Sequence, residues 1–582
     1  MKLSTATLNR TTASRLFFFS QTPVTPPSFQ TLISFPTSRF SLRFSSFNSE
    51  KRPLGFSCYS AMAASPPPSR SPVQVRDTID LTPKEKQIFD RLLDVLRYFN
   101  LQTQLRVAGG WVRDKLLGKD CYDIDIALDD MFGREFCEKV NQFLTSVGEE
   151  TQGIGVIQCN PEQSKHLETA RMRLFDEWID FVNLRSEDYS DSSRIPTMRF
   201  GTAEEDAYRR DLTINSLFYN INKNSVEDFT GRGKADLKSG RIVTPLPPKQ
   251  TFLDDPLRVL RAIRFGARFE FELDEELKAA ASDDEVRAAL EDKISRERIG
   301  HEIDLMVSGN QPVQAVKYIS ELQLFGSVFS LPLQLEPSLS DGYDKVCVAH
   351  MDSAWKLLQA IEYSFTADQQ RLCLYAALFL PFREVVYKDS KAKTFPVVNY
   401  IIRNSLKLKS SDAETIVSLH IAAQRFVSLM QYMVSNEDVQ FVEVDWKSEI
   451  IDVPAASKLR ILVGLLLRDI KDYWQPALIL SMLLNTEDIQ SGTSLSEVDK
   501  KKELYKVVEE SIVRQGLDKI WGVKPLVNGK QIMSVLNLKT GGPLVREWQQ
   551  KLLEWQLAHP SGTEEECIDW MTKAQNKRAR TE

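Results

Sequence analysis

Apolar and polar residues follow different patterns in the two parts of this chain. Before residue 245, short apolar segments with a period of two are separated by glycine, proline and acidic residues, which predicts strands. These segments are residues 105–108, 153–158, 169–174 and 177–184. Beyond residue 254, apolar residues recur every three or four positions, which predicts helices almost throughout. The fold class expected is therefore α+β, with a small mixed sheet followed by an all-helical part.

Helices are also expected around the strands. Thr82-Pro83 is typical of an N-cap followed by a first helical residue, and apolar residues with helical period follow it. A second helix is expected over residues 133–146. By contrast, residues 187–206 show no apolar periodicity, which predicts a long loop. Long loops inside catalytic domains more often have a function than none.

The segment from Arg106 to Leu128 carries the candidate chemistry. Asp123 and Asp125 alternate with isoleucines, so in a strand both carboxylates would point to the same face. Two adjacent carboxylates repel each other unless a cation lies between them, and hard oxygen ligands suit Mg²⁺. Upstream, Gly109-Gly110 would let backbone amides approach a phosphate at the start of a helix. This combination indicates phosphoryl or nucleotidyl transfer, although an isolated D-x-D is usually only a solvated strand face.

Composition and charge narrow the class of protein. With 582 residues, 42% hydrophobic and 26% charged, the chain has the composition of a soluble globular protein of several domains. Its longest apolar run, residues 461–467, is too short to cross a bilayer, so no membrane partner is expected. The net charge of −6 means that any nucleic acid must bind to a local basic surface. Seven scattered cysteines suggest neither zinc nor disulfides and fit a reducing compartment.

The first 70 residues differ from the rest. They are rich in Ser, Thr, Phe and Pro, contain spaced arginines, and have no acidic residue before Glu50, which is typical of an organelle transit peptide for a mitochondrion or chloroplast. A disordered tail is the alternative. Met62 could be a second start that yields a cytoplasmic or nuclear form. The basic cluster Lys577–Arg580 could be a nuclear signal or a solvated tail.

The motifs resemble a known family. G-G-x-V-R-D at residues 109–114, followed by D-x-D, resembles the polymerase β-type nucleotidyltransferases, in the branch of class II tRNA nucleotidyltransferases and bacterial poly(A) polymerases. Further family motifs follow in order: R-R-D-x-x-I-N at residues 209–215, D…G…D-L at 228–237, D-D-x-x-R at 254–258 where many members have E-D-x-x-R, and S-R-E-R at 295–298.

The resemblance assigns roles to these residues. It implies that Asp123 and Asp125 are catalytic and hold two Mg²⁺ ions, with Asp180 as a third carboxylate; the alternative for Asp180 is an edge-strand residue facing water. The nucleotide-binding residues that it implies are Gly109, Gly110, Arg113, Arg210, Asp211, Asn215, Asp255, Arg258 and Arg261.

Base selection would depend on one pair of these residues. Asp255 and Arg258, expected one helical turn apart, present a carboxylate beside a guanidinium. That pair complements the donor and acceptor groups on the pairing edges of C and A, and it repels those of U and G. The alternative is an ordinary surface ion pair. Arg298 is expected to pair with Glu302, four residues later, in a structural role.

The function implied by the resemblance is addition of C, C and A to the tRNA 3′ end from CTP and ATP. A poly(A) polymerase, a CC- or A-adding enzyme, and a helical RNA-binding scaffold with an inactive head remain alternatives. The expected parts are a transit peptide and linker (1–75), a catalytic head (76–245), a helical neck (246–310) and a helical body and tail that bind tRNA (311–582). The motifs do not indicate which proteins, if any, bind to this chain.

Overall fold

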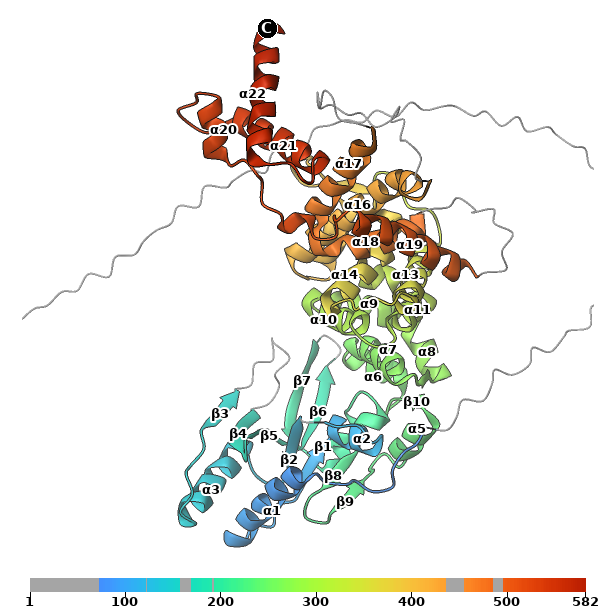
Figure 1. Cartoon of the computed structure of the whole chain (residues 1–582). Coiled ribbons are helices and arrows are strands. Elements are labelled where there is room, and N and C mark those ends of the chain that lie inside the picture. The colour runs from blue at the N-terminus through green and yellow to red at the C-terminus, as the bar shows by residue number, and fades with distance from the viewer. Residues whose placement is uncertain are drawn as a thin grey trace, which may run out of the picture. The chain divides into compact units, whose positions relative to one another are not determined.

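The computed structural model of the chain describes residues 73–121, 123–157, 169–190, 193–435, 455–484 and 496–581 (Figure 1). The expected transit peptide and Met62 lie outside the described residues, as do the side chains of the basic cluster Lys577–Arg580. The chain from Arg70 to Glu582 forms one compact unit. We call residues 76–245 the head, residues 246–310 the neck and the later residues the body.

A seven-stranded sheet forms the centre of the head. Its strand order is β3-β4-β5-β2-β1-β8-β9. The strands are β1 (Leu105–Ala108), β2 (Ile124–Leu128), β3 (Ile154–Ile157), β4 (Thr169–Leu174), β5 (Glu177–Asn183), β8 (Phe218–Asn220) and β9 (Ser225–Glu227). β2 and β5 run parallel and the other neighbours antiparallel, which confirms the expected mixed sheet.

Two helices pack against the apolar side of this sheet. α1 (Pro83–Tyr98) begins with the expected cap: the Thr82 hydroxyl accepts a hydrogen bond from the Glu85 amide, and the Glu85 carboxylate accepts one from the Thr82 amide. α3 (Gly133–Ser146) crosses β4 and β5 and covers the buried Phe181. A Cβ at Gly133 would lie only 2.4 Å from the Phe181 carbonyl oxygen, so glycine is what lets α3 approach β5 this closely.

The loop expected over residues 187–206 is wrong. The segment forms the antiparallel hairpin of β6 (Arg185–Ser190) and β7 (Ser193–Phe200), and α4 (Ala203–Tyr208) follows it. Backbone hydrogen bonds between two strands can form without alternation of apolar and polar residues, so hydrophobic periodicity gives no sign of this hairpin.

The neck helices begin with a break at Asp255. α6 (Pro248–Asp254) and α7 (Leu257–Phe269) are separate, and Asp255 between them is extended at φ −136° and ψ 97°. The D-D-x-x-R motif suggests a helix that begins at Asp254, but α7 begins at Leu257, because the residue before a proline, here Asp255, disfavours the helical conformation. β10 (Arg241–Ile242) pairs in parallel with β11 (Glu272–Leu273), which ties the end of the head to the neck.

The remainder is largely helical, as the sequence predicts, apart from a short antiparallel hairpin within residues 386–396. The other elements are α2 (Gly110–Leu116), η2 (Thr213–Asn215), α5 (Gly233–Ser239), α8 (Glu275–Ala281), α9 (Asp284–Lys293), α10 (Arg296–Val307), α11 (Pro312–Glu321), α12 (Phe325–Val328), α13 (Tyr343–Ala360), α14 (Ala367–Leu378), η3 (Leu380–Phe382), β12 (Val386–Lys388), β13 (Thr394–Pro396), α15 (Val397–Tyr400), η4 (Ile401–Ser405), α16 (Ser410–Ser435), α17 (Ala455–Ile470), η5 (Lys471–Tyr473), α18 (Trp474–Leu484), α19 (Glu497–Arg514), η6 (Ile520–Gly522), α20 (Gly529–Val535), α21 (Pro543–Ala558) and α22 (Glu564–Thr581).

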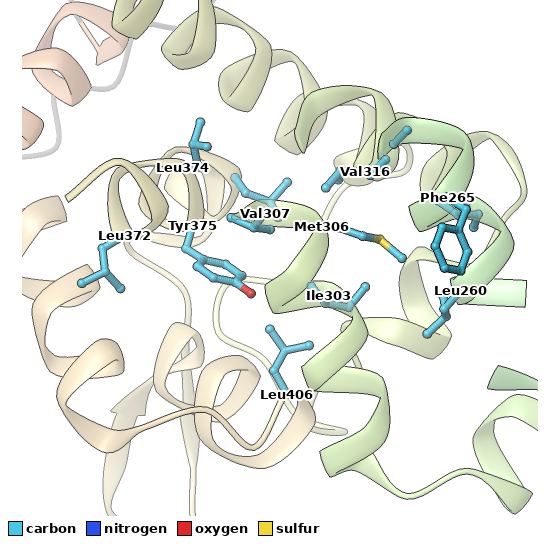
Figure 2. Packing of buried hydrophobic residues seen from close by; sticks show 14 of the residues in the cluster. Leu260, Phe265, Ile303, Met306, Val307, Val316, Leu372, Leu374, Tyr375 and Leu406 are labelled. Atoms are coloured by element: carbon cyan, nitrogen blue, oxygen red, sulfur yellow. The ribbon is translucent and has the colours of Figure 1, made fainter. Parts of the chain in front are cut away.

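One apolar core runs from the neck into the body. Figure 2 shows Leu260 and Phe265 of α7, Met306 of α10 and Tyr375 of α14 among its members. α20, α21 and α22 enclose a second, smaller core around Trp548. Among the described residues, no helix is both long and apolar enough to cross a membrane.

Candidate active site

The two aspartates of the D-x-D motif lie at the start of β2. Asp123 directly precedes the strand, and Asp125 lies opposite Asp180 of the parallel strand β5. Ile124 and Ile126 are buried on the other face, as expected. Burial, then the Asp123 carboxylate, then the Asp180 carboxylate raise the pKa of Asp125 to about 6. A divalent cation would relieve this repulsion, so the oxygen donors of Asp123 and Asp125 fit a hard metal ion.

Asp180 is already engaged by an arginine. Arg171 on β4 donates from Nε to Oδ1 at 2.5 Å and from Nη2 to Oδ2 at 2.7 Å. Within the described ranges, no three His, Cys, Asp or Glu side chains form a group that could hold a metal ion. The metal-ligand role of Asp123 and Asp125 and the role of Asp180 therefore stay predictions.

The first glycine of the motif makes room for Arg210. Gly109 precedes α2 with φ +68°, and a Cβ there would lie 2.8 Å from Arg210 Nη1. Glycine is needed at residue 109 because the backbone has a positive φ and because a side chain would collide with Arg210. Asp206 holds Arg210 in place by accepting from its Nε at 3.0 Å and from its Nη2 at 2.8 Å. Burial alone would raise the pKa of Asp206, but Arg209 and Arg210 lower it to about 2.

A chain of hydrogen bonds links the R-R-D motif to α2 in the head and to α7 in the neck. Arg113 donates to Asn215 Oδ1, and Asn215 Nδ2 donates to Asp211 Oδ1 at 3.0 Å. Arg261 of α7 donates from Nε to Asp211 Oδ2 at 2.8 Å. Burial would raise the pKa of Asp211, but Arg261, the Asn215 hydrogen bond and Arg258 lower it to about 2.

Arg113 itself is buried. Its guanidinium lies 4.7 Å from the centroid of the Phe269 ring, and burial lowers its pKa. This placement favours a role in holding Asn215, and a direct contact of Arg113 with nucleotide stays a prediction.

The expected base-reading residues are each held by another group. Arg298 Nη2 donates to Asp255 Oδ2 at 3.0 Å, and Arg258 Nη2 donates to the Arg209 carbonyl at 2.7 Å. The expected pair of Arg298 with Glu302 is wrong. Glu302 instead accepts from Arg264 Nε at 2.6 Å, because α7 packs against α10 and brings its arginines closer.

The structure thus brings the predicted residues together in the head and at the start of the neck, and it adds four that the sequence did not assign to the site. Asp206, Arg171, Glu187 and Arg298 each contact a predicted residue. Asp206 stands four positions before Arg210, a spacing that could have revealed the pair. The others come from separate elements, so no local spacing could show them.

Comparison with known proteins defines the class. Residues 105–243 match the model of the Poly A polymerase head domain. Together with the paired carboxylates on a mixed sheet, this makes the head a nucleotidyltransferase of the polymerase β type.

Full-length relatives define the family. The chain is 34% identical to the mitochondrial CCA tRNA nucleotidyltransferase of Candida glabrata, over 85% of this chain and 96% of that protein. It is 34% identical to the one of Saccharomyces cerevisiae, over 84% and 93%. The chain belongs to the CCA tRNA nucleotidyltransferase family. The solved structure of the Bacillus stearothermophilus CCA-adding enzyme in complex with CTP shares the fold, with a TM-score of 0.57 at 16% identity over 86% of this chain and all of that one.

Proposed function

We propose that this enzyme adds C, C and A to the 3′ end of tRNA, using CTP and ATP and releasing pyrophosphate. The observation that carries the proposal is the direct link between the R-R-D motif and the neck. Arg261 reaches Asp211 and Arg258 reaches the Arg209 carbonyl, which supports a single site for phosphate binding and base reading. Relatives of nearly the same length carry the name CCA tRNA nucleotidyltransferase, which supports the same activity.

Enzymes of this family use a divalent metal, and we propose two Mg²⁺ ions held by Asp123 and Asp125. When bound, such ions lower the pKa of the attacking hydroxyl and neutralise the leaving pyrophosphate. The tRNA 3′-hydroxyl oxygen attacks the α-phosphorus, and the bond from that phosphorus to the pyrophosphate oxygen breaks.

The chain's own residues position the nucleotide. The Arg210 guanidinium, fixed by Asp206 beside Gly109, neutralises triphosphate charge. Asp211 and Asn215 hold the ribose, and Asp255 with Arg258 receives the base edge of C or A. On this proposal, the enzyme accelerates the reaction by positioning the reactants and by stabilising the charge that develops in the transition state.

The test is single-nucleotide incorporation. Purified enzyme is given tRNAs that end before the first C, after CC and after CCA, with CTP, ATP, UTP or GTP offered singly. CCA addition requires C on the first substrate, A on the second and nothing on the third. Long A tails would indicate a poly(A) polymerase, addition of only C or only A would indicate a partial enzyme, and no incorporation would indicate an inactive scaffold.

A further inference from the structure

Two rows of side chains cross β2, β5 and β4 on the face that carries the carboxylates. Asp125, Asp180 and Arg171 are register partners in the first row. In the second row Trp178 is the register partner of Arg173 and lies beside the position of Asp123. Residues two apart on a strand share a face, so both rows point to the same side. Trp178 and Arg173 therefore continue the surface that carries Asp123 and Asp125.

Trp178 is exposed, and its ring is not needed for packing of the core. Its side chain is 54% exposed, whereas Trp111, Trp474 and Trp548 are buried. The alternate residues Ile179 and Phe181 supply the apolar face of β5, so Trp178 adds nothing to the core. A large exposed aromatic ring beside charged residues is typical of a binding surface.

The outer strand leaves space next to the two arginines. Gly155 on β3 lies opposite Arg171, and Gly153 precedes it by two residues, opposite the position of Arg173. A Cβ at Gly153 would meet nothing within 4 Å, and one at Gly155 would meet nothing closer than 3.8 Å. β3 therefore presents bare backbone beside this surface.

Both arginines can also reach a ligand. The side chains of Arg171 and Arg173 are 44% and 51% exposed, and Arg173 pairs only with the exposed Asp176 at 3.3 Å among the ion pairs of the described residues. Exposed ion pairs of this kind contribute little to stability, so a phosphate can replace the Asp176 carboxylate on Arg173 at small cost.

We propose that Trp178, Arg171 and Arg173 form the docking surface for the single-stranded 3′ end of the tRNA. Trp178 stacks on a base near the 3′ end, and the arginines contact the phosphates that flank it. Stacking on an aromatic ring tolerates any base, which suits an acceptor whose last base changes at each step of CCA addition. The register places Trp178 one strand away from Asp123 and Asp125, where the 3′-hydroxyl must react, and the two arginines one strand further. The inference rests on the proposed function, because its occupant is the acceptor of that reaction.

The experiment compares Trp178→Ala with Trp178→Phe in the full chain. Readouts are KM and kcat for a tRNA lacking CCA, KM for CTP, and binding of the same tRNA by fluorescence anisotropy. Trp178→Ala should weaken tRNA binding and raise the tRNA KM by about 5- to 100-fold, the effect of losing one base stack, and leave the CTP KM unchanged. Trp178→Phe should restore most of the affinity, because it keeps a ring on which a base can stack.

Two further variants complete the design. Tyr98→Ala removes an equally exposed aromatic ring at the end of α1 and should change no kinetic constant. Arg173→Ala should reduce the salt dependence of tRNA binding by about 0.7 in the slope of log K against log salt, as expected for one phosphate contact. Unchanged tRNA KM and affinity in Trp178→Ala would overturn the inference. Failure of the wild-type enzyme to add C or A would instead refute the proposed function.

Discussion

At the scale of single residues, the environment of each aspartate in the head decides its chemistry. Asp125 has a raised pKa because it is buried beside Asp123 and Asp180, whereas Asp206 and Asp211 have lowered values because arginines surround them. The first environment favours binding of a metal cation, and the second keeps permanent charges that fix arginines in position.

Replacing Asp123 or Asp125 by Ala should abolish addition of both C and A. Both nucleotides use one metal site, and loss of one charge there should lower the rate by about 10²–10³ or more. Incorporation of CTP and of ATP on the matching tRNAs measures the effect, with the exposed Asp90→Ala on α1 as control. Loss of only one of the two additions would indicate two active sites.

Asp206→Asn should lower stability in a pH-dependent way. The fall in its pKa from 3.8 to about 2 corresponds to about 2 kcal/mol of folding free energy. Since the folded pKa is depressed, this contribution is complete above about pH 4 and is lost as the pH falls toward 2.

Thermal unfolding of wild type and Asp206→Asn between pH 7 and pH 3 measures the difference. It should be constant from pH 7 to 5 and shrink below about pH 4. The variant should also have a higher KM for CTP, since Arg210 loses the carboxylate that holds it. A stability difference that does not vary with pH would contradict this explanation.

At the scale of elements, the break between α6 and α7 positions the base-reading residues. Pro256 keeps Asp255 out of the helix, and the Asp255 carboxylate then reaches Arg298 on α10. Arg258, in the first turn of α7, reaches back to the Arg209 carbonyl in the head. Two helices and the head thus cooperate in placing one carboxylate and one guanidinium.

Asp255→Ala and Arg258→Ala should each relax nucleotide selection. Loss of a matched bidentate contact costs about 1–3 kcal/mol of discrimination, so UTP or GTP should be incorporated more often relative to CTP and ATP. Arg298→Ala should have a smaller effect in the same direction, because it only frees the Asp255 side chain. Single-nucleotide incorporation on tRNA lacking CCA provides the measurement.

The matched control is Arg264→Ala on the same helix. Arg264 pairs with Glu302, so its loss should affect stability and leave selection unchanged. Wild-type preference for C and A in both Asp255→Ala and Arg258→Ala would show that other residues read the base.

At the scale of the whole molecule, we expect the N-terminal segment and the part of the chain that the structure describes to have separate roles. The active-site contacts described here all lie between Gly109 and Glu302, and the first described residue is Val73. We therefore expect the acid-poor segment before residue 70 to serve targeting rather than the active site. The fungal relatives named above are mitochondrial enzymes, which agrees with a targeting role for such a segment.

Translation from Met1 should direct the protein to a mitochondrion or chloroplast, and translation from Met62 should leave it in the cytoplasm or nucleus. The reason is that residues 1–58 hold the basic, acid-poor stretch and the folded part does not. Fluorescent fusions starting at each methionine would show the distributions. Identical distributions would remove the targeting hypothesis.

The sequence by itself determined the strands and helices that have a regular apolar period. Residues 169–174 and 133–146 form a strand and a helix with the expected bounds, because burial of one face imposes the period on the sequence. The ordered motifs likewise predicted the nucleotidyltransferase class, since close glycines and alternating acids reflect local geometry around a phosphate and a metal.

Only the tertiary structure decided what joins distant segments. The hairpin of β6 and β7 depends on backbone pairing rather than on apolar periodicity, and the partners of Asp180, Asp255 and Glu302 come from other elements. Each arginine of α7 could have formed a solvated ion pair, as spacing alone would suggest. The packing of the head against the neck, and of α7 against α10, instead brings these arginines next to buried carboxylates. An unpaired charge is costly in a buried position, so the arginines pair with those carboxylates.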